Sequence, residues 1–541
     1  MSTAVEDTPF TKINDIVIHI ATVNGSGSQS ANTALLRSIF QMGIPVSGKN
    51  LFPSNIQGLP TWFTIRANKE GYIARRDQID LLVAMNPETA HEDLFKLQPG
   101  ALVIYDQSLK LDSLRDDVDF FPVPFSEIVK SLVPNAKLRK LVSNIVYDGI
   151  VAKLIGIEMK EVEEAIRKQF KTKPKAAELN ISAARAGYEF AENKLPSQSK
   201  FRLQRMNKTA GKIIIDGNAA GALGCLFAGV SVVTWYPITP SSSLVEQLIE
   251  YMKKYRIDQE SGKATFAILQ AEDEIAALGM ALGAGWAGAR AMTSTSGPGI
   301  SLMSELSGFA YFAEIPGVVF DIQRTGPSTG LPTRTMQGDI LSTTFLSHGD
   351  ARHIMLFPYS PEDMFELAGM AFDLAEQFQT IVFVMSDLDL GMNNWMADPF
   401  DYPEKPLNRG KVLDAEQLQK IENFGRYKDM DGDGVPYRTL PGTKHHKAPY
   451  FTRGSGHDEY AHYTEDHTVF EKLLQRLHRK IETARGFMPK PVVEEMEGAQ
   501  IGIVAYGTSH YPIVESRDIL RENHAIKTDY LRLRAYPFTK E

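Results

Sequence analysis

Apolar and polar residues follow one another along this chain in the order expected for strands joined by helices. The first clear case is an apolar run at residues 16–22, followed by a glycine-containing turn and by helically spaced apolar residues at 35–40. Two further apolar runs, at residues 81–85 and 101–105, are separated by helical or turn segments. This repeated order is typical of a doubly wound α/β domain.

A second series of the same kind occupies the middle of the chain. Five strands are predicted there, each followed by helical or loop sequence: residues 230–235, 264–270, 289–295, 317–322 and 380–385. A third, shorter series gives a strand at 500–506, a helix at 514–523 and a strand at 527–533. The predicted fold class is therefore α/β, with several doubly wound domains.

The domain boundaries follow from changes in composition between these series. From residue 163 to 208 the apolar periodicity weakens and basic and small polar residues accumulate, which indicates a helix leading into a linker. The last series has too few elements for an independent domain, so it either borrows a neighbour or is truncated. The predicted parts are a first α/β domain at 11–195, a linker at 196–210, a second domain at 211–400, a surface connection at 401–490 and a partial domain at 491–541.

Composition and charge narrow the class of partner. The chain is 43% hydrophobic and 23% charged, as in ordinary globular proteins, and its formal charge is -8. Without long Lys/Arg runs, neither nucleic acid nor an anionic membrane is expected as the main partner. The longest apolar stretch, residues 275–289, is too short to span a bilayer.

The N-terminus and the cysteine usage both favour a cytoplasmic protein. The first twenty residues contain early acids and lack a basic start followed by an apolar stretch, so they do not resemble a signal peptide. The single cysteine, Cys225, excludes a disulfide framework and cannot ligate a four-cysteine iron–sulfur cluster. No metal site is assigned to this chain, because the acidic turn at residues 429–434 lacks the last ligand of a calcium loop.

Three loop segments carry candidate chemistry. The turn at residues 236–243 follows a predicted strand, so Thr239 lies at a carboxyl strand end, where open α/β sheets bind ligands. The glycine loop at 293–299 lies at the end of the predicted strand at 289–295. A third strand-end loop carries Arg324, whose planar fork suits a carboxylate. Each pattern also suits a purely structural helix start or a solvent-facing charge.

An acidic helix start provides a fourth candidate. Glu272, Asp273 and Glu274 precede a helix that is unusually rich in small residues, including Gly279 and Gly283. Acids near a helix N-terminus are favoured by the helix dipole, so a solvated cap is the simplest explanation. The glycines would also let another backbone or a flat ring come close. The pattern therefore predicts a carboxylate aimed into a tightly packed, water-poor place.

Taken together, these four segments resemble the alpha subunit of the 2-oxoacid:ferredoxin oxidoreductases, especially the 2-oxoglutarate type. They are YPITPSS at 236–242, QAEDEIAALGMALGAGWAGAR at 270–290, TSTSGPG at 293–299 and QRTGPSTGLPTRT at 323–335. The N-terminal domain is similar to the gamma subunit of that family, fused ahead of the alpha part. The resemblance implies a pyrimidine-type domain for thiamine diphosphate at 211–400 and a partial transketolase C-terminal-like domain at 491–541.

The resemblance also implies roles at the cofactor. Glu272 would be the catalytic carboxylate that hydrogen-bonds N1′ of the aminopyrimidine, where it favours the tautomer that activates the thiazolium carbon. Pro237, Ile238, Thr239 and Gly297 would contact the same cofactor. A glutamine in place of the glutamate could bond N1′ but could not exchange its proton.

Substrate and phosphate contacts are implied in the same way. Thr239, Arg324 and Thr333 would bind the carboxylate and the oxo group of a 2-oxoacid, with Arg324 the stronger electrostatic candidate. In the first domain, Gly25 and Gly27 form a possible coenzyme A or phosphate loop before a helix. A tight turn without a ligand explains the same two glycines equally well, and family members usually carry a richer glycine loop.

The implied reaction is oxidative decarboxylation of a 2-oxoacid, most simply 2-oxoglutarate to succinyl-CoA, with coenzyme A as co-substrate and ferredoxin as electron acceptor. A separate beta subunit is expected to carry the [4Fe–4S] cluster, the diphosphate site and Mg²⁺, in a heterodimer or a dimer of heterodimers. Three alternatives remain open: specificity for pyruvate or branched-chain acids, a self-contained thiamine enzyme, and a non-catalytic α/β assembly subunit.

Overall fold

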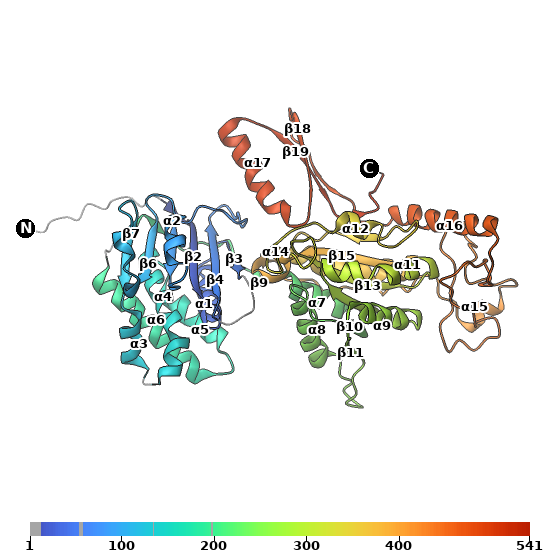
Figure 1. Cartoon of the computed structure of the whole chain (residues 1–541), viewed down its shortest axis with the longest axis horizontal. Coiled ribbons are helices and arrows are strands. Elements are labelled where there is room, and N and C mark those ends of the chain that lie inside the picture. The colour runs from blue at the N-terminus through green and yellow to red at the C-terminus, as the bar shows by residue number, and fades with distance from the viewer. Residues whose placement is uncertain (1–11, 53–57, 134, 196–198, 541) are drawn as a thin grey trace, which may run out of the picture. The chain divides into compact units, whose positions relative to one another are not determined.

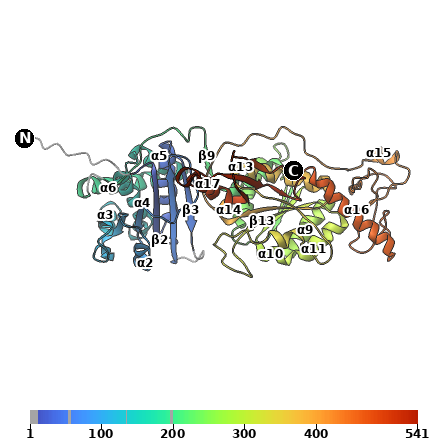
Figure 2. The ribbon, with the colours of Figure 1, turned by 90° about the horizontal axis from the view of Figure 1, so that it is seen from above.

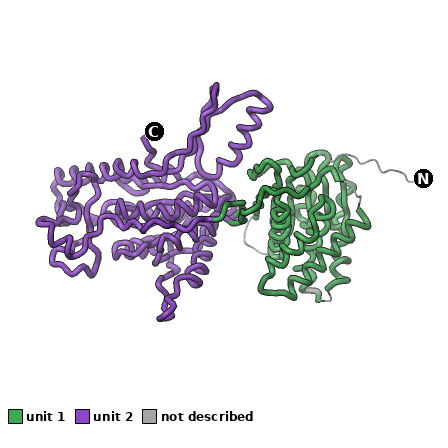
Figure 3. The backbone as a smooth tube through the Cα atoms, turned by 180° about the vertical axis from the view of Figure 1, so that it is seen from behind, with its two compact units in different colours: residues 1–215, 393–399 green, residues 216–392, 400–541 purple. Residues whose placement is uncertain are grey.

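The computed structural model describes residues 12–52, 58–133, 135–195 and 199–540 of the chain. Two compact units are present: residues 1–215 with 393–399, and residues 216–392 with 400–541 (Figure 3). The first residue of the predicted N-terminal domain, residue 11, and residues 196–198 of the predicted linker lie outside the described residues. Among the described helices, none is long and apolar enough to cross a lipid bilayer.

Unit 1 is built on a six-stranded sheet with the order β3-β4-β2-β5-β6-β7 (Figure 1). Its strands are β2 (Asp15–Val23), β3 (Val46–Leu51), β4 (Pro60–Asn68), β5 (Leu81–Ala84), β6 (Leu102–Asp106) and β7 (Asp119–Val123). The strands β2, β5, β6 and β7 run parallel, whereas β4 is antiparallel to both β2 and β3. The three strands predicted in this sheet are confirmed as β2, β5 and β6, and β3, β4 and β7 are additions.

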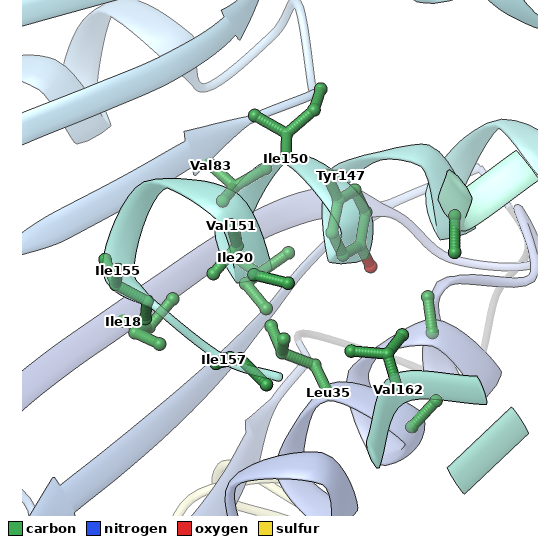
Figure 4. Packing of buried hydrophobic residues seen from close by; sticks show 14 of the residues in the cluster. Ile18, Ile20, Leu35, Val83, Tyr147, Ile150, Val151, Ile155, Ile157 and Val162 are labelled. Carbon is green, nitrogen blue, oxygen red and sulfur yellow. The ribbon is translucent and has the colours of Figure 1, made fainter. Parts of the chain in front are cut away.

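Helices complete this unit and enclose its core. They are α1 (Ser28–Gln41), α2 (Ala90–Phe95), α3 (Phe125–Leu132), α4 (Ala136–Ile155), α5 (Met159–Gln169) and α6 (Pro174–Lys194). Figure 4 shows Ile18 and Ile20 of β2 packed with Leu35 of α1 and with Tyr147 and Ile150 of α4. Two short pairs, β1 (Lys12–Ile13) with β8 (Phe201–Arg202) and β9 (Ile213–Ile215) with β16 (Trp395–Ala397), join distant segments of unit 1.

Unit 2 contains a seven-stranded sheet with the order β11-β10-β12-β13-β15-β14-β20, parallel except at the β14–β20 edge. Its strands are β10 (Val232–Trp235), β11 (Ala267–Gln270), β12 (Ala291–Thr295), β13 (Gly317–Gln323), β14 (Ile354–Leu356), β15 (Ile381–Asp387) and β20 (Ala535–Tyr536). The five predicted strands of the middle series are all present in this sheet. The α/β prediction is therefore confirmed.

Helices cover both faces of the large sheet: in Figure 2, β13 lies between α13 and the group α9 to α11. They are α7 (Gly217–Phe227), α8 (Ser242–Tyr255), α9 (Glu274–Trp286), α10 (Gly297–Leu302), α11 (Ser304–Ala313), α12 (Ile340–Thr344), α13 (Pro361–Phe378) and α14 (Leu388–Met392). Several of these helices begin directly where a parallel strand ends. The loops that join strand to helix therefore meet along one edge of the sheet.

The C-terminal part of unit 2 forms a small sheet with the order β17-β19-β18. It consists of β17 (Val492–Glu494), β18 (Ile501–Tyr506), α17 (His510–His524) and β19 (Thr528–Leu533). The chain then returns to the large sheet, because β20 pairs with β14. The last residues thus contribute an edge strand to a neighbouring sheet, which is one of the two arrangements that the sequence left open.

A buried ion cluster holds the segment that connects the large sheet of unit 2 to the small C-terminal sheet. This segment contains α15 (Ala415–Gln419) and α16 (His467–Arg485). Arg476 and Lys480 of α16 both contact the carboxylate of Glu314, and all three side chains are buried. Burial alone would raise the pKa of Glu314, but the two cations lower it to about 2. Breaking such a buried pair is costly, so this cluster fixes α16 against the large sheet.

The close packing of α4 against α6 gives a test of unit 1. A Cβ added to Gly187 would overlap the backbone carbonyl of Val146, and one added to Gly149 would overlap that of Ala184. We expect Gly187→Ala to lower the free energy of opening of α4 and α6 by about 1–3 kcal/mol, because neither backbone can yield easily. Hydrogen–deuterium exchange of peptides from both helices measures this change.

Ser182→Ala on the exposed side of α6 is the control, with an expected change within about 0.5 kcal/mol. Equal exchange rates in the two variants would show that the helices are not in the close contact described.

Candidate functional site

The predicted site segments meet at the carboxyl edge of the large sheet. The strands β10, β12 and β13 are neighbours in that order, and each ends in one of the three predicted loops. The loop after β13 contacts the turn after β10 directly: Arg324 Nη1 donates a hydrogen bond of 2.7 Å to the Thr239 carbonyl. The structure therefore brings Thr239 and Arg324 together, although 85 residues separate them.

The turn after β10 is fixed by its own backbone and serines. The Ile238 carbonyl accepts hydrogen bonds from the backbone N–H groups of Ser241 and Ser242, and Ser242 Oγ accepts one from the Ile238 N–H at 2.9 Å. These bonds close the turn before α8, whose first cap residue, Ser241, makes no side-chain capping hydrogen bond. Pro237 is exposed, and Ile238 and Thr239 are half-buried. The outer side of this turn is therefore available to a ligand or another chain.

The acidic start of α9 contains two differently placed glutamates. Asp273 caps the helix by accepting a hydrogen bond of 2.7 Å from the Ala276 N–H. Glu272 precedes this cap and is exposed, whereas Glu274 is the first helical residue and only 7% exposed. Glu274 is beside the glycine loop, because its Cγ lies 2.7 Å from where a Cβ on Gly299 would be.

Glu274 is a functional candidate that the sequence pattern did not single out. The helical periodicity of the sequence could have indicated Glu274. This residue falls on the same helix face as the buried residues Ala277, Leu278 and Ala281, at spacings of three, four and seven. Glu272 lies outside that stripe. A carboxylate inside an apolar stripe at a helix start needs a special reason, and a cofactor nitrogen is one.

The glycine loop after β12 is packed too tightly for any side chain. A Cβ on Gly299 would overlap the Thr295 hydroxyl, and one on Gly297 would come within 2.8 Å of Asp339 Oδ2. Gly297 is the first residue of α10, directly after the buried Ser296. The predicted contact residue Gly297 is thus placed between the end of β12 and the loop that follows β13.

Unsatisfied polar atoms near this edge show that the site fits a polar cofactor. The Ser296 hydroxyl is fully buried and has no hydrogen-bond partner among the described residues. The same holds for Oδ1 of Asn218 in α7, whose amide nitrogen donates to the Pro240 carbonyl at 2.9 Å. Buried polar groups are normally satisfied, so both atoms are suited to bind a ligand.

Arg324 and Thr333 are both buried, and both side chains make hydrogen bonds within the chain. Besides Thr239, the Arg324 guanidinium donates to the Thr329 carbonyl at 3.1 Å, while its Nε has no partner in the described part of the chain. Burial lowers the pKa of Arg324, and the negative charges of Asp339 and Glu274 oppose this effect. The Thr333 hydroxyl accepts a hydrogen bond of 2.9 Å from Arg334.

Two aspartates behind the glycine loop have raised pKa values. Asp321 of β13 is fully buried, and burial together with the neighbouring Asp339 raises its pKa well above the usual range. Burial also raises the pKa of Asp339, although the contacts with Asp321 and Arg324 oppose this. Neither Asp321 oxygen has a hydrogen-bond donor among the described residues, so burial favours the protonated form of this carboxyl.

The predicted phosphate loop belongs to unit 1 and is described separately. Gly25 and Gly27 both have positive φ, and Gly27 directly precedes α1. The Asn144 amide donates to the Ser26 carbonyl at 2.8 Å and to its hydroxyl at 3.1 Å. The Gly27 side of the turn is thus packed on α4, with Leu141 O 3.1 Å from the position of a Cβ, whereas Gly25 is exposed.

A parallel sheet with polar strand-end loops at its carboxyl edge is the class of α/β protein that binds ligands at that edge. Residues 223–421 match the family described as "Pyruvate flavodoxin/ferredoxin oxidoreductase, thiamine diP-bdg", and residues 17–190 match "Pyruvate ferredoxin/flavodoxin oxidoreductase". The two matches cover both units, so the prediction of a thiamine-diphosphate-binding domain is confirmed at the level of the family.

Individual relatives of the chain belong to the same family. The chain is 31% identical to 2-oxoacid:ferredoxin oxidoreductase 2, subunit alpha, of Aeropyrum pernix, over 97% of this chain and 88% of that protein. It is 28% identical to the 2-oxoglutarate oxidoreductase subunit KorA of Mycobacterium tuberculosis, over 93% and 80%.

A solved structure is also similar, the 2-oxoglutarate:ferredoxin oxidoreductase of Magnetococcus marinus. The TM-score is 0.87 at 27% identity, with 97% of this chain and 89% of that chain covered, and 2-oxoglutarate, coenzyme A and succinyl-CoA are bound in that structure. The chain belongs to the 2-oxoacid:ferredoxin oxidoreductase family and is an alpha subunit of it.

The raised pKa of Asp321 predicts a pH dependence of stability. In the unfolded chain Asp321 loses its proton at a pH of about 3.9. The folded chain keeps it to higher pH, because burial raises the pKa. Between the unfolded and the folded pKa of Asp321, folding therefore takes up a proton. The contribution of Asp321 to the free energy of unfolding falls as pH rises from about 4 toward the folded pKa.

We expect Asp321→Asn, which cannot ionise but can still donate to Asp339, to remove this component. Urea unfolding between pH 4.5 and 7.5 should show the variant gaining stability relative to the natural chain as pH rises. Parallel curves for the two proteins would mean that Asp321 carries no raised pKa.

Proposed function

We propose that this alpha subunit acts on 2-oxoglutarate and, with coenzyme A and ferredoxin, converts it to succinyl-CoA. The observation that carries the proposal is the likeness over 97% of the chain to an enzyme solved with 2-oxoglutarate bound. The buried Arg324 at the carboxyl edge of the large sheet supports it. A 2-oxoacid always presents a carboxylate, and a buried arginine is its natural partner.

In this proposal Thr239, Arg324 and Thr333 bind the 2-oxoacid. Arg324 has an unpaired Nε and holds the Thr239 turn in place through its Nη1, so one side chain both attracts the carboxylate and sets the turn beside it. The Thr333 hydroxyl, which already accepts from Arg334, retains its own proton for the substrate oxygen. Specificity for pyruvate or a branched-chain acid is the alternative outcome of the assay described below.

The proposed cofactor contacts are Pro237, Ile238, Thr239 and Gly297, with a carboxylate at the start of α9. When bound, thiamine diphosphate supplies the carbon nucleophile and the electron sink for decarboxylation. The chain's own task is to hold a proton at N1′ of the aminopyrimidine. Both Glu272 and Glu274 are candidates, and the burial of Glu274 and its position beside Gly299 favour Glu274.

The other half of the reaction requires a partner. Among the described residues, no group of three or more His, Cys, Asp and Glu side chains could hold a metal ion, and burial raises the pKa of the enclosed Cys225 thiol. We propose that a beta subunit supplies the diphosphate site, Mg²⁺ and the [4Fe–4S] cluster. The turn at Gly25 and Gly27 stays a prediction for coenzyme A or another phosphate.

Reconstitution of the enzyme tests whether a beta subunit must supply the rest of the site. The chain, purified with and without its partner, is supplied with thiamine diphosphate, Mg²⁺ and coenzyme A, and reduction of a low-potential dye by several 2-oxoacids is followed. We expect activity only with the partner present, and the highest kcat/KM for 2-oxoglutarate.

Full activity of the lone chain would contradict the proposed half-site and support a self-contained enzyme. Equal kcat/KM values for pyruvate and 2-oxoglutarate would contradict the proposed specificity, and no activity with any 2-oxoacid would favour an assembly subunit.

A matched pair of variants locates the carboxylate. Glu274→Gln and Glu272→Gln each replace one acid with its neutral isostere in the same helix start. If Glu274 holds the N1′ proton, its variant should lose about 10²- to 10⁴-fold in kcat, because an amide cannot exchange that proton. Glu272→Gln, at an exposed position, should then stay within about twofold of the natural chain.

Circular dichroism of bound thiamine diphosphate in both variants separates loss of proton exchange from loss of cofactor binding. The reverse order of kcat values would assign the carboxylate to Glu272, as the sequence resemblance implies.

A further inference from the structure

The loop that carries Arg324 and Thr333 is fastened at its far end to the C-terminal segment of the chain. The fastening residue is Gln337. Its side-chain Nε2 donates to Asp387 Oδ2 at 2.8 Å and to Thr508 Oγ1 at 3.2 Å. Its backbone carbonyl accepts from the Tyr506 hydroxyl at 3.1 Å, and its Oε1 accepts from the Ser509 hydroxyl at 3.4 Å.

The geometry of the C-terminal turn is adapted to this contact. The turn at Gly507–Ser509 joins β18 to α17, and Gly507 has a φ of +58°. A Cβ at Gly507 would come within 2.5 Å of Gln337 Nε2, so a glycine is needed for the approach as well as for the backbone conformation.

Asp387 connects the same turn to the large sheet. It is the last residue of β15 and is 2% exposed. Its carboxylate accepts from the Thr508 hydroxyl at 2.5 Å, from Gln337 Nε2 and from the Leu390 N–H. Three donors on one buried carboxylate make a rigid junction between β15, the Gln337 loop and the C-terminal turn.

The junction is close in sequence to the proposed substrate contacts. Three residues separate Gln337 from Thr333. The loop begins after Gln323, which is the register partner of Asp387 on β15, and Gln323 Oε1 also accepts from the Asp339 N–H at 3.1 Å. Both ends of the loop are therefore attached to the ends of two adjacent strands, and only the Gln337 end also depends on the C-terminal segment.

We propose that Gln337 and Thr508 are positioning residues that set the 2-oxoacid affinity of the loop without touching the substrate. The proposal rests on the proposed function, in which Arg324 and Thr333 bind the 2-oxoacid. The C-terminal segment is then part of the substrate-recognition apparatus. Loosening its turn lets the loop shift and misplaces Thr333 relative to Arg324.

The test uses the assembled enzyme with its partner and steady-state kinetics. Thr508→Val keeps the shape of the side chain but removes the hydroxyl that joins Asp387 and Gln337. We expect the KM for the 2-oxoacid to rise about fivefold to tenfold, as for loss of a hydrogen bond to a charged group. The KM for coenzyme A and kcat should change less than about twofold, and Thr508→Ser should restore the natural KM.

Two further variants guard against an effect on folding alone. Thr528→Val makes the same substitution in β19 of the same small sheet, where the hydroxyl accepts a hydrogen bond of 3.1 Å from Arg517 Nε. It should lower the melting temperature without raising the 2-oxoacid KM. Gln337→Met removes the other partner, and the double variant Gln337→Met/Thr508→Val should raise KM no more than the larger single effect, because both changes break one junction.

Arg324→Gln separates this inference from the proposed function. If Arg324→Gln raises the 2-oxoacid KM and Thr508→Val does not, the positioning role is overturned while the proposed function stands. If Arg324→Gln leaves the KM unchanged, the proposed substrate contact fails. A KM increase in Thr528→Val equal to that in Thr508→Val would show a general loss of stability, and would likewise overturn the positioning role.

Discussion

The hydrogen bond from the Arg324 guanidinium to the Thr239 carbonyl joins the two loops on which the site depends. A buried cation is costly to desolvate, so it requires nearby negative charge. Glu274 and Asp339 supply it, since both act electrostatically on Arg324. The neighbouring Asp321 is fully buried, and its pKa is raised by burial and by Asp339. The acids around the site therefore follow from one arginine that must be kept charged inside the fold.

Much of the fold was predictable because the central strands of the large sheet, β12, β13 and β15, are buried along their whole length, and strands buried on both faces give continuous apolar runs. The sequence was less informative where packing depends on small residues. Helix α6 lies against α4 through Gly149 and Gly187, so its buried face is short of large apolar side chains. The same composition looked like a weakening of periodicity toward a linker. Strands β3 and β4 were missed for another reason, since polar residues are mixed into both.

The candidate site was predictable to the level of its loops. Thr239 and Arg324 lie at strand ends whose order in the sheet brings them together, and a strand-end position is visible in the sequence. The difference between Glu272 and Glu274 is a matter of two positions, which is within the usual uncertainty of a helix start. Gln337 could not be found in this way, because its partners Asp387 and Thr508 come from distant segments, and Thr508 meets it only when the C-terminal segment folds back.

Unsatisfied groups distinguish this edge of the sheet from a merely structural one. The Ser296 hydroxyl, Asn218 Oδ1 and Arg324 Nε are buried near the same strand ends without a hydrogen-bond partner among the described residues. Each such atom costs free energy unless something binds it. At the Gln337 junction, by contrast, the Asp387 carboxylate has three donors. A fully bonded junction behind incompletely bonded groups is what a binding site needs, because the junction holds the loop rigid while the open groups remain to be satisfied by a ligand.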